Sequence, residues 1–443
     1  MKKLFLLVLV AVLLLCALTG CAKGSKLLDP NAPVTLNLWH VYGEQADAPM
    51  NRLVEEFNAT VGREKGVVVS VTNVTSSSKI SGQLYDAQNG VPGAAEMPDL
   101  FSCHTNTAFT LGAENLVNWK EHFKEEELSE FVPEFIEDGM LEDSLAVFPV
   151  SKSTYALFIN GSQFERFSAQ TGVTYDQLST WEGFFAAAES YYEWSGGKTF
   201  CAFDYLIRHV ELDILARGEE LTYTESGWYD MESAAVRESF DQFMLPLAKG
   251  HIAVADQYAN TQVMTGEALC GIGSSAAVNY YNDVVTYPDN TTEPTNLRVL
   301  PLPRTGEGSE FMPMTGVGLA AWKTTEQKAE AAAVFVKWFT EGERNLDFVV
   351  ETGYMPVSNS AYDAIEGYEY PDAGYEDLYE AIRTMRQEYT AVVRPDFEGY
   401  YDKVDELYGF LREMQAELAD RLAAGESAEA LAQECWAFFT TIG

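Results

Sequence analysis

The first part of the body alternates between two hydrophobic periodicities, and this alternation restricts the fold more than any other feature. Residues 34–39 alternate apolar and polar positions, as a half-buried strand does. Apolar residues over 50–57 then recur three and four positions apart, which predicts a helix. A second strand over 67–71 and a third that begins at Asp99 complete the pattern. Strand, helix and strand in this order favour an α/β fold with a mostly parallel sheet flanked by helices.

The rest of the chain also combines predicted helices with predicted strands. Helices are expected to begin near Thr180 and after Thr324, which has Gln327 as its capping-box partner. A C-terminal helix ending at Gly425 carries an apolar stripe that we interpret as core. Further strands are expected over 146–150, 155–159, 268–272 and 317–322, and the stripe comprises Leu407, Phe410, Leu411, Met414, Leu418 and Leu422. A body of this length exceeds one simple core, so two lobes are expected.

The N-terminus has the features of an export signal. Lys2 and Lys3 precede an apolar run over 4–15, which is too short for a typical membrane-spanning helix. The run leads to 18–21, Leu-Thr-Gly-Cys, which resembles the bacterial lipobox. We therefore expect residues 1–20 to be a removed signal peptide, Cys21 to be lipidated, and 21–33 to tether the body to the membrane. An ordinary cleaved signal with a chance cysteine is the alternative.

Charge restricts the partners of the chain. The precursor has 67 acidic and 29 basic side chains and a net charge of −38. This excludes nucleic acid, because affinity for nucleic acid depends on Lys and Arg that neutralise phosphates. It also argues against docking on anionic lipid. The ligand's charge stays open, because a cleft can differ in sign from the outer surface.

Cysteine and histidine are scattered. We favour buried free thiols for the cysteines beyond Cys21, although one disulfide remains open. The histidines form no metal-ligand spacing, so no metal site and no cofactor are expected. The cysteines are Cys103, Cys201, Cys270 and Cys435, and the histidines are His40, His104, His122, His209 and His251.

A series of short segments runs in one order along nearly the whole body. They are 36–40, 55–58, 97–101, 148–151, 157–160, 180–182, 266–270, 300–303, 352–357 and 425–431. In this order the chain resembles the extracellular solute-binding proteins of carbohydrate-type ABC importers (family 1). Within that family its spacing is most similar to glycerol-3-phosphate-binding proteins. Two positions differ from the glycerol-3-phosphate-binding proteins. Thr105 stands where those proteins tend to carry a glutamate, and residues 79–81 replace an aromatic-acidic pair.

The resemblance implies a two-lobed, periplasmic-binding-protein-like α/β fold of type II with a ligand cleft between the lobes. The chain would cross between lobes near Val150, Phe311 and Met355. The implied protein is an extracytoplasmic lipoprotein and a monomer, which captures a sugar, oligosaccharide or polyol phosphate and delivers it to ABC permease subunits. The implied lobes are 34–150 with 312–354, and 151–311 with 355–443.

Aromatic residues are the first candidate ligand contacts. Trp39 and Tyr42 follow the first strand, at the sheet edge where α/β proteins bind ligands. Tyr354 lies between Gly353 and a proline, which would fix its direction. Such rings stack on sugars, and core packing is the alternative role; for Tyr354 we favour the cleft. His40 could bond either a ligand or a loop carbonyl.

Hydroxyl groups and one arginine complete the candidate site. Ser153 and Thr154 lie beside the expected crossing, and Ser274 and Ser275 at a strand-to-helix junction, where N–H groups and hydroxyls converge on an acceptor. Local backbone bonds and helix capping are their alternative roles. Arg394 falls where glycerol-3-phosphate-binding proteins place an anion-binding arginine, and a structural salt bridge would suit it as well.

The hypothesis that the protein is an enzyme has less support in the sequence. The segment 271–276 fits the pattern G-x-G-x-x-A, but no acidic residue ends a second strand about twenty residues later. A secreted glycosidase is the main alternative function, because it too would use aromatic rings and paired carboxylates. With 67 acids in the chain, no motif selects one pair. Metal capture is a third class, which the dispersed histidines do not favour.

Overall fold

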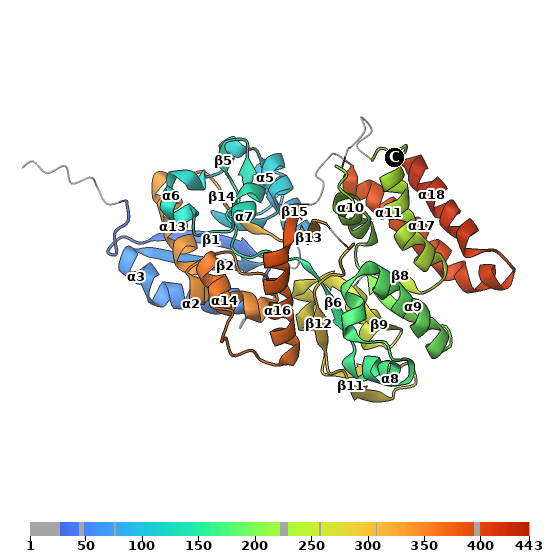
Figure 1. Ribbon diagram of the computed structural model, residues 1–443. Helices are drawn as coiled ribbons and strands as arrows, with labels where there is room; N and C mark the ends of the chain where they lie inside the picture. The colour runs from blue at the N-terminus through green and yellow to red at the C-terminus, as the bar shows by residue number, and fades with distance from the viewer. Residues whose placement is uncertain are drawn as a thin grey trace, which may run out of the picture.

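The structure is a computed structural model that describes residues 27–43, 48–74, 77–221, 229–256, 258–306, 308–393 and 399–442. Two separate sheets organise it, and Figure 1 places them in two lobes side by side. The predicted two-lobed α/β fold is confirmed. Cys21 and Arg394 lie outside the described residues, as do the predicted signal peptide and most of the tether.

The first sheet has four strands in the order β14-β3-β1-β2. The first three strands in the sequence pair in parallel, and β14 joins β3 antiparallel after the chain returns from the other lobe. Leu36 and Leu38 are fully buried because alternate residues of β1 face the core. The strands are β1 (Val34–His40), β2 (Val67–Asn73), β3 (Leu100–Cys103) and β14 (Gly318–Ala321).

Helices and short segments from two stretches of the chain surround this sheet. Phe57 of α2 packs edge-on against Phe335 of α13, which ties the early and the late helices to one core. These elements are α2 (Pro49–Ala59), α3 (Val61–Lys65), α4 (Ser77–Gln88), α5 (Thr105–Leu111), α6 (Glu125–Leu128), α7 (Pro133–Asp138), β4 (Met140–Leu141), β5 (Ser144–Leu145), α13 (Glu326–Phe339), α14 (Gly342–Thr352) and α15 (Asn359–Asp363), with 3-10 turns η1 (Ala113–Asn115) and η2 (Trp119–Glu121).

The second sheet has five strands in the order β12-β6-β9-β7-β8. Its strands β7, β8 and β9 are parallel, whereas β6 and β12 run antiparallel to their neighbours. The carboxyl ends of the three parallel strands therefore lie at one edge. The strands are β6 (Tyr155–Ile159), β7 (Thr199–Phe203), β8 (Ile252–Val254), β9 (Ala268–Ser274) and β12 (Arg298–Leu300), and β10 (Val284–Thr286) pairs with β11 (Thr292–Pro294) separately.

The helices of the second lobe include the C-terminal pair α17 and α18, which Figure 1 places beside α11. The predicted apolar stripe is core: four of its members are buried, and Phe410 and Leu422 are partly buried against the same cluster. The elements are α8 (Gly161–Thr171), η3 (Tyr175–Ser179), α9 (Trp181–Ser195), α10 (Leu206–Ala216), α11 (Ala234–Ala248), α12 (Ala259–Met264), η4 (Ser275–Tyr280), α17 (Tyr400–Ala423) and α18 (Ala428–Ile442).

Segments remote in sequence pair where the chain connects the two sheets. The strand β13 (Glu310–Met314) pairs in parallel with β15 (Tyr389–Val393), which follows α16 (Ala373–Glu388). Isolated bridges join Lys152 to Met355 and Ser153 to Thr315. The lobe boundaries remain a prediction, and these bridges lie close to the expected crossings.

Two local predictions are wrong. Helix α13 is capped by Thr325, whose hydroxyl accepts from the N–H of Lys328 at 3.2 Å, and not by Thr324. Residues 146–150 form no regular strand but only a single bridge at Phe148. Pro149 explains the second difference, because it has no N–H to donate to a ladder.

Candidate functional site

Two adjoining cavities lie where the lobes meet. They have volumes of about 50 and 30 Å³ and share Met314, Thr315 and Tyr401. The first cavity is also lined by His104, Thr105, Asn106, Asp138, Gly316 and Val393. The second is also lined by Tyr155, Tyr205, Ile207, Arg208, Pro313, Tyr400 and Val404. The lining thus joins the end of β3 in the first lobe to the end of β7 in the second.

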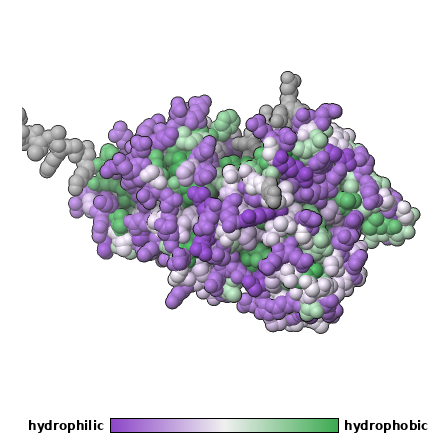
Figure 2. All heavy atoms as spheres, in the orientation of Figure 1, coloured by the Kyte–Doolittle hydropathy of each residue, from purple (hydrophilic) through white to green (hydrophobic). Residues whose placement is uncertain are grey.

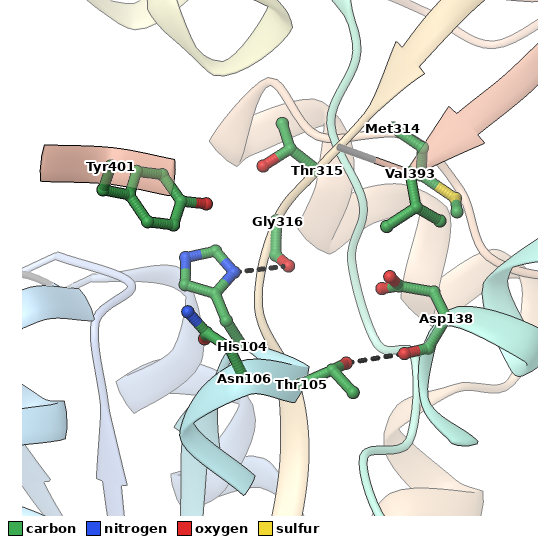
Figure 3. A pocket seen from close by; sticks show the side chains of 9 residues that line it. All are labelled: His104, Thr105, Asn106, Asp138, Met314, Thr315, Gly316, Val393 and Tyr401. Atoms are coloured by element: carbon green, nitrogen blue, oxygen red, sulfur yellow. Dashed lines mark hydrogen bonds between the residues drawn. The ribbon is translucent and has the colours of Figure 1, made fainter. Parts of the chain in front are cut away.

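The first cavity is polar (Figure 3). Nδ1 of His104 lies 3.1 Å from the main-chain oxygen of Gly316, and the hydroxyl of Thr105 donates to the main-chain oxygen of Asp138 at 2.6 Å. The carboxylate of Asp138 pairs with the ammonium of Lys152. These bonds fix the beginning of α5 and the end of α7 against the connecting segment at Gly316. The walls offer donors and acceptors that suit a polar ligand.

The second cavity contains a buried guanidinium. Nη1 of Arg208 donates to the carboxylate of Glu211 at 2.7 Å, and Nη2 donates to the main-chain oxygen of Val392 at 2.7 Å. The hydroxyl of Tyr400 donates to the same carboxylate at 2.9 Å. Burial raises the pKa of Glu211, although the charge of Arg208 opposes this shift. The pair holds the start of α17 beside α10.

Four aromatic side chains are exposed in the described part of the chain, and each follows the carboxyl end of a sheet strand. Phe109 is 73% exposed and lies in α5, the helix after β3. Tyr205 follows β7 at 45%, and Tyr258 follows β8 at 62%. Tyr280 ends η4 after β9 at 67%. In α/β sheets this edge is where ligands bind, so these four rings are candidate ligand contacts.

The outer surface of the molecule differs in character from the lining of the two cavities. Figure 2 presents a face on which hydrophilic residues predominate, in keeping with the large negative charge. Within the described ranges, no group of three or more His, Cys, Asp or Glu could hold a metal ion. Nor does any helix there have the length and apolarity needed to cross a membrane.

A family comparison decides the class of protein. The model for bacterial extracellular solute-binding proteins matches residues 52–374, most of the chain. The chain belongs to this family. The solute-binding protein is therefore extracytoplasmic, as the predicted export signal implies. No curated protein sequence matches it.

Solved structures of similar fold include several binding proteins. The cyclic α-maltosyl-1,6-maltose binding protein of Arthrobacter globiformis shares 15% identity over 93% of this chain and 99% of that chain, with a TM-score of 0.68. UgpB of Mycobacterium tuberculosis, solved with glycerophosphocholine, shares 16% over 93% and 98%, with a TM-score of 0.65. The GacH receptor of Streptomyces glaucescens, solved with acarbose, shares 16% over 92% and 98%, with a TM-score of 0.63. These likenesses support the fold of this solute-binding protein.

Three predicted contacts of the solute-binding protein are buried: Trp39 and His40 lie within β1 and not on the loop after it, and Tyr42 follows the strand. Trp39, His40 and Tyr42 are exposed by 4% or less. The imidazole of His40 lies 3.1 Å from the amide oxygen of Asn51, and burial lowers its pKa to about 4. The hydroxyls of Tyr42 and Ser151 are 3.0 Å apart. In this structure the three residues pack inside the first lobe, and their binding role stays a prediction.

The predicted hydroxyls gather at the connection between lobes. Ser153 pairs with Thr315, and the main-chain oxygen of Thr154 accepts from the N–H of Ser275 at 2.8 Å. The hydroxyl of Ser274 accepts from a main-chain N–H and is the least buried of the four. The capping alternative is therefore realised by Ser274, whereas the hydroxyls of Thr154 and Ser275 are buried with no hydrogen-bond partner among the described residues. Ligand contacts by the same groups stay a prediction.

Tyr354 remains partly exposed in the solute-binding protein. Its ring meets that of Tyr42 edge to face, with centroids 5.8 Å apart. Arg394 lies outside the described residues, directly after Val393, which lines the first cavity.

Asp138, Tyr205 and Tyr401 line the cavities but were not predicted from the sequence. Tyr205 had a detectable signal, since it follows the apolar run 199–203 as Tyr42 follows β1. Asp138 and Tyr401 had none, because each lies at the end of a helix and meets the cavity only through the packing of the lobes.

Proposed function

We propose that this solute-binding protein captures a saccharide between its lobes and delivers it to the permease subunits of an ABC importer. The placement of the exposed aromatic side chains carries the proposal: all four in the described residues follow the carboxyl end of a sheet strand. Aromatic faces stack on sugar rings, and neighbouring hydroxyl, amide and carboxylate groups bind sugar hydroxyls. Several proteins of similar fold are sugar-binding proteins by name, which supports this class of ligand.

The two lobes suggest a binding cycle. Solute would bind first to one lobe, and rotation about the paired connecting segments would bring the other lobe over it. The closed molecule then presents a composite surface for the permease. Of the residues predicted from sequence, we propose Ser274 and Tyr354 as direct contacts, because both remain partly exposed. Tyr42 would support the ring of Tyr354 from behind.

A ligand screen followed by calorimetry tests the proposal. The panel contains maltose, maltotriose, cycloalternan, glycerol 3-phosphate and glycerophosphocholine. A ligand at a hundredfold excess over its Kd should add about 2.7 kcal/mol to the free energy of unfolding, seen as a rise in Tm. With the best saccharide, Tyr205→Ala should weaken binding by about 1–3 kcal/mol, since a buried aromatic contact is lost.

A matched control separates stacking from general loss of apolar surface. Val91 is 42% exposed in the loop after α4, away from the two cavities, so Val91→Ala should bind as wild type does. Stoichiometric retention of unmodified saccharide supports a binding protein, whereas turnover supports a glycosidase. Absence of binding by every saccharide in the panel would refute the proposal.

We also propose that Cys21 anchors the protein through acyl chains. The support is the lipobox-like segment 18–21 and the extracellular family. Cys21→Ala should abolish labelling by a fatty-acid analogue and leave an unprocessed precursor. Equal labelling of the variant and the wild type would show that the cysteine is not the anchor.

A further inference from the structure

A buried ion pair links the ligand cavity to the connecting segment. The ammonium of Lys152 pairs with the carboxylate of Asp138, and their side chains are 2% and 14% exposed. Lys152 bridges to Met355, where remote segments pair, and Asp138 ends α7. An ammonium this deeply buried requires a charged partner, because its desolvation is costly. The position of the Asp138 carboxylate is therefore fixed by the fold.

The carboxylate of Asp138 faces the first cavity (Figure 3), and its main-chain oxygen is held by Thr105. An ionised carboxylate offers about four acceptor sites on its two oxygens. The hydrogen bond from Lys152 engages one of these oxygens. The remaining acceptor capacity is available on the side that lines the cavity.

The second buried pair provides a contrast. Glu211 is fully buried, and it accepts from Arg208, Tyr229 and Tyr400. Its oxygens are thereby occupied inside the protein. Of the described residues that line the two cavities, Asp138 is the single carboxylate. It is thus the carboxylate that a ligand can reach.

The charges near the first cavity favour a neutral ligand. None of the described residues that line it is a lysine or arginine. Lys152 is not among the lining residues, and its positive charge is neutralised by the carboxylate of Asp138. A ligand phosphate at this end would meet a carboxylate and no cation in the described lining. Hydroxyl groups, in contrast, could donate to the carboxylate in charge-assisted hydrogen bonds.

We infer that Asp138 is a specificity-determining residue, which accepts hydrogen bonds from the hydroxyls of a neutral polyhydroxy solute and disfavours an anionic group at this end of the site. The inference rests on the proposed saccharide function. It makes that function narrower, because it selects neutral sugars over sugar or polyol phosphates.

Calorimetry on Asp138→Asn tests it, with maltotriose and cycloalternan as neutral probes and glycerol 3-phosphate as the anionic probe. The amide keeps the shape but loses the charge and some acceptor capacity. Affinity for the neutral probe that wild type binds best should fall about tenfold, and affinity for glycerol 3-phosphate should not fall. Asp143→Asn, in the exposed turn between β4 and β5, is the matched control and should bind as wild type does.

Folding of the variant is checked separately, because Asp138→Asn leaves the ammonium of Lys152 without its charged partner. If that variant does not fold, Asp138→Asn combined with Lys152→Met removes the buried charge and is measured instead, with the same expected loss. Unchanged saccharide affinity in a folded variant overturns the inference and leaves the saccharide function intact. Wild type that binds only the anionic probe, or no saccharide, overturns both.

Discussion

Ser153 and Thr315 exchange both of their main-chain hydrogen bonds, with N···O distances of 2.9 and 3.0 Å. The two residues are remote in sequence and lie on segments that connect the two sheets. Lys152, which precedes Ser153, is bridged to Met355. Three segments of the chain are therefore joined at the consecutive residues 152 and 153. A rotation of the lobes would have to pivot beside this pairing, because these bonds hold the segments in fixed register.

Gly316 should tolerate no side chain. Its φ is +107°, and an added Cβ would lie 3.2 Å from the Cα of Lys152 and from the backbone nitrogen of Ser153. Gly316→Ala should lower the free energy of unfolding by about 1–3 kcal/mol, measured by urea denaturation. The control is Gly82→Ala in α4, where a Cβ meets nothing within 4 Å. The control should be neutral or stabilising by about 0.5–1 kcal/mol. If Gly316→Ala were as stable as wild type, the prediction that a Cβ at this position causes strain would be wrong.

His209 should make the protein sensitive to acid. It packs among Tyr155, Trp181 and Phe243, and neither ring nitrogen has a hydrogen-bond partner within the described residues. Burial lowers its pKa to about 3, and the nearby charge of Arg208 acts in the same direction. The unfolded chain takes up a proton below about pH 6.5 that the folded protein does not. His209 therefore costs stability as the pH falls from 6.5 towards 3.

His209→Phe is the test of this acid sensitivity. Relative to wild type, the variant should gain about 1.4 kcal/mol in the free energy of unfolding for each pH unit between 6 and 4, measured by denaturant titration. Phe243→Leu changes a neighbouring ring and removes no titrating group, so its pH slope should match that of wild type. A parallel pH dependence in His209→Phe and wild type would exclude the buried imidazole as a cause.

The four cysteines in the described chain are free and buried, and they should be unreactive in the native protein. Burial raises the pKa of Cys103 and Cys435 to about 12, and it also raises that of Cys201, which lies beside Cys270 in the register of β7 and β9. For a chain that starts at residue 22, Ellman's reagent at pH 8 should detect no thiol before denaturation and four after it. A reductant should leave Tm unchanged. A lower Tm in reductant would indicate a disulfide.

Arg394 and Tyr205 should report the charge of the ligand. If the solute is a neutral sugar, Tyr205→Ala should weaken binding more than Arg394→Ala, because the ring supplies contact area and the guanidinium has no anion to pair with. If the solute carries a phosphate, Arg394→Ala should cost about 2–5 kcal/mol when the pair is buried. Calorimetry on both variants with the best ligand of the screen decides between them.

Much of the fold could be predicted because hydrophobic alternation is local. The predicted strand 155–159 coincides with β6, and the strands at 34 and 67 begin where expected. Errors arose where local signals were ambiguous. Thr324 and Thr325 are both good caps, and only the hydroxyl bonded to Lys328 identifies the true one.

The site could be predicted only in part, because it depends on how the lobes pack. Trp39 was expected just after the first strand, yet it lies within β1, packs with residues of α4 and β3, and is 4% exposed. Asp138 and Tyr401 come from helices of different lobes and meet at the cavity. No spacing in the sequence predicts that these two side chains lie close together, because their proximity results from tertiary packing.

The pairing of β14 with β3 has a consequence for the order of folding. The strands β1, β2 and β3 are made first, but the edge of β3 stays unpaired until β14 arrives, after every strand of the second sheet. Closing so long a loop is slow, and an open strand edge invites aggregation in the meantime. The sheet that starts first as the chain is synthesised is therefore the one that is completed last.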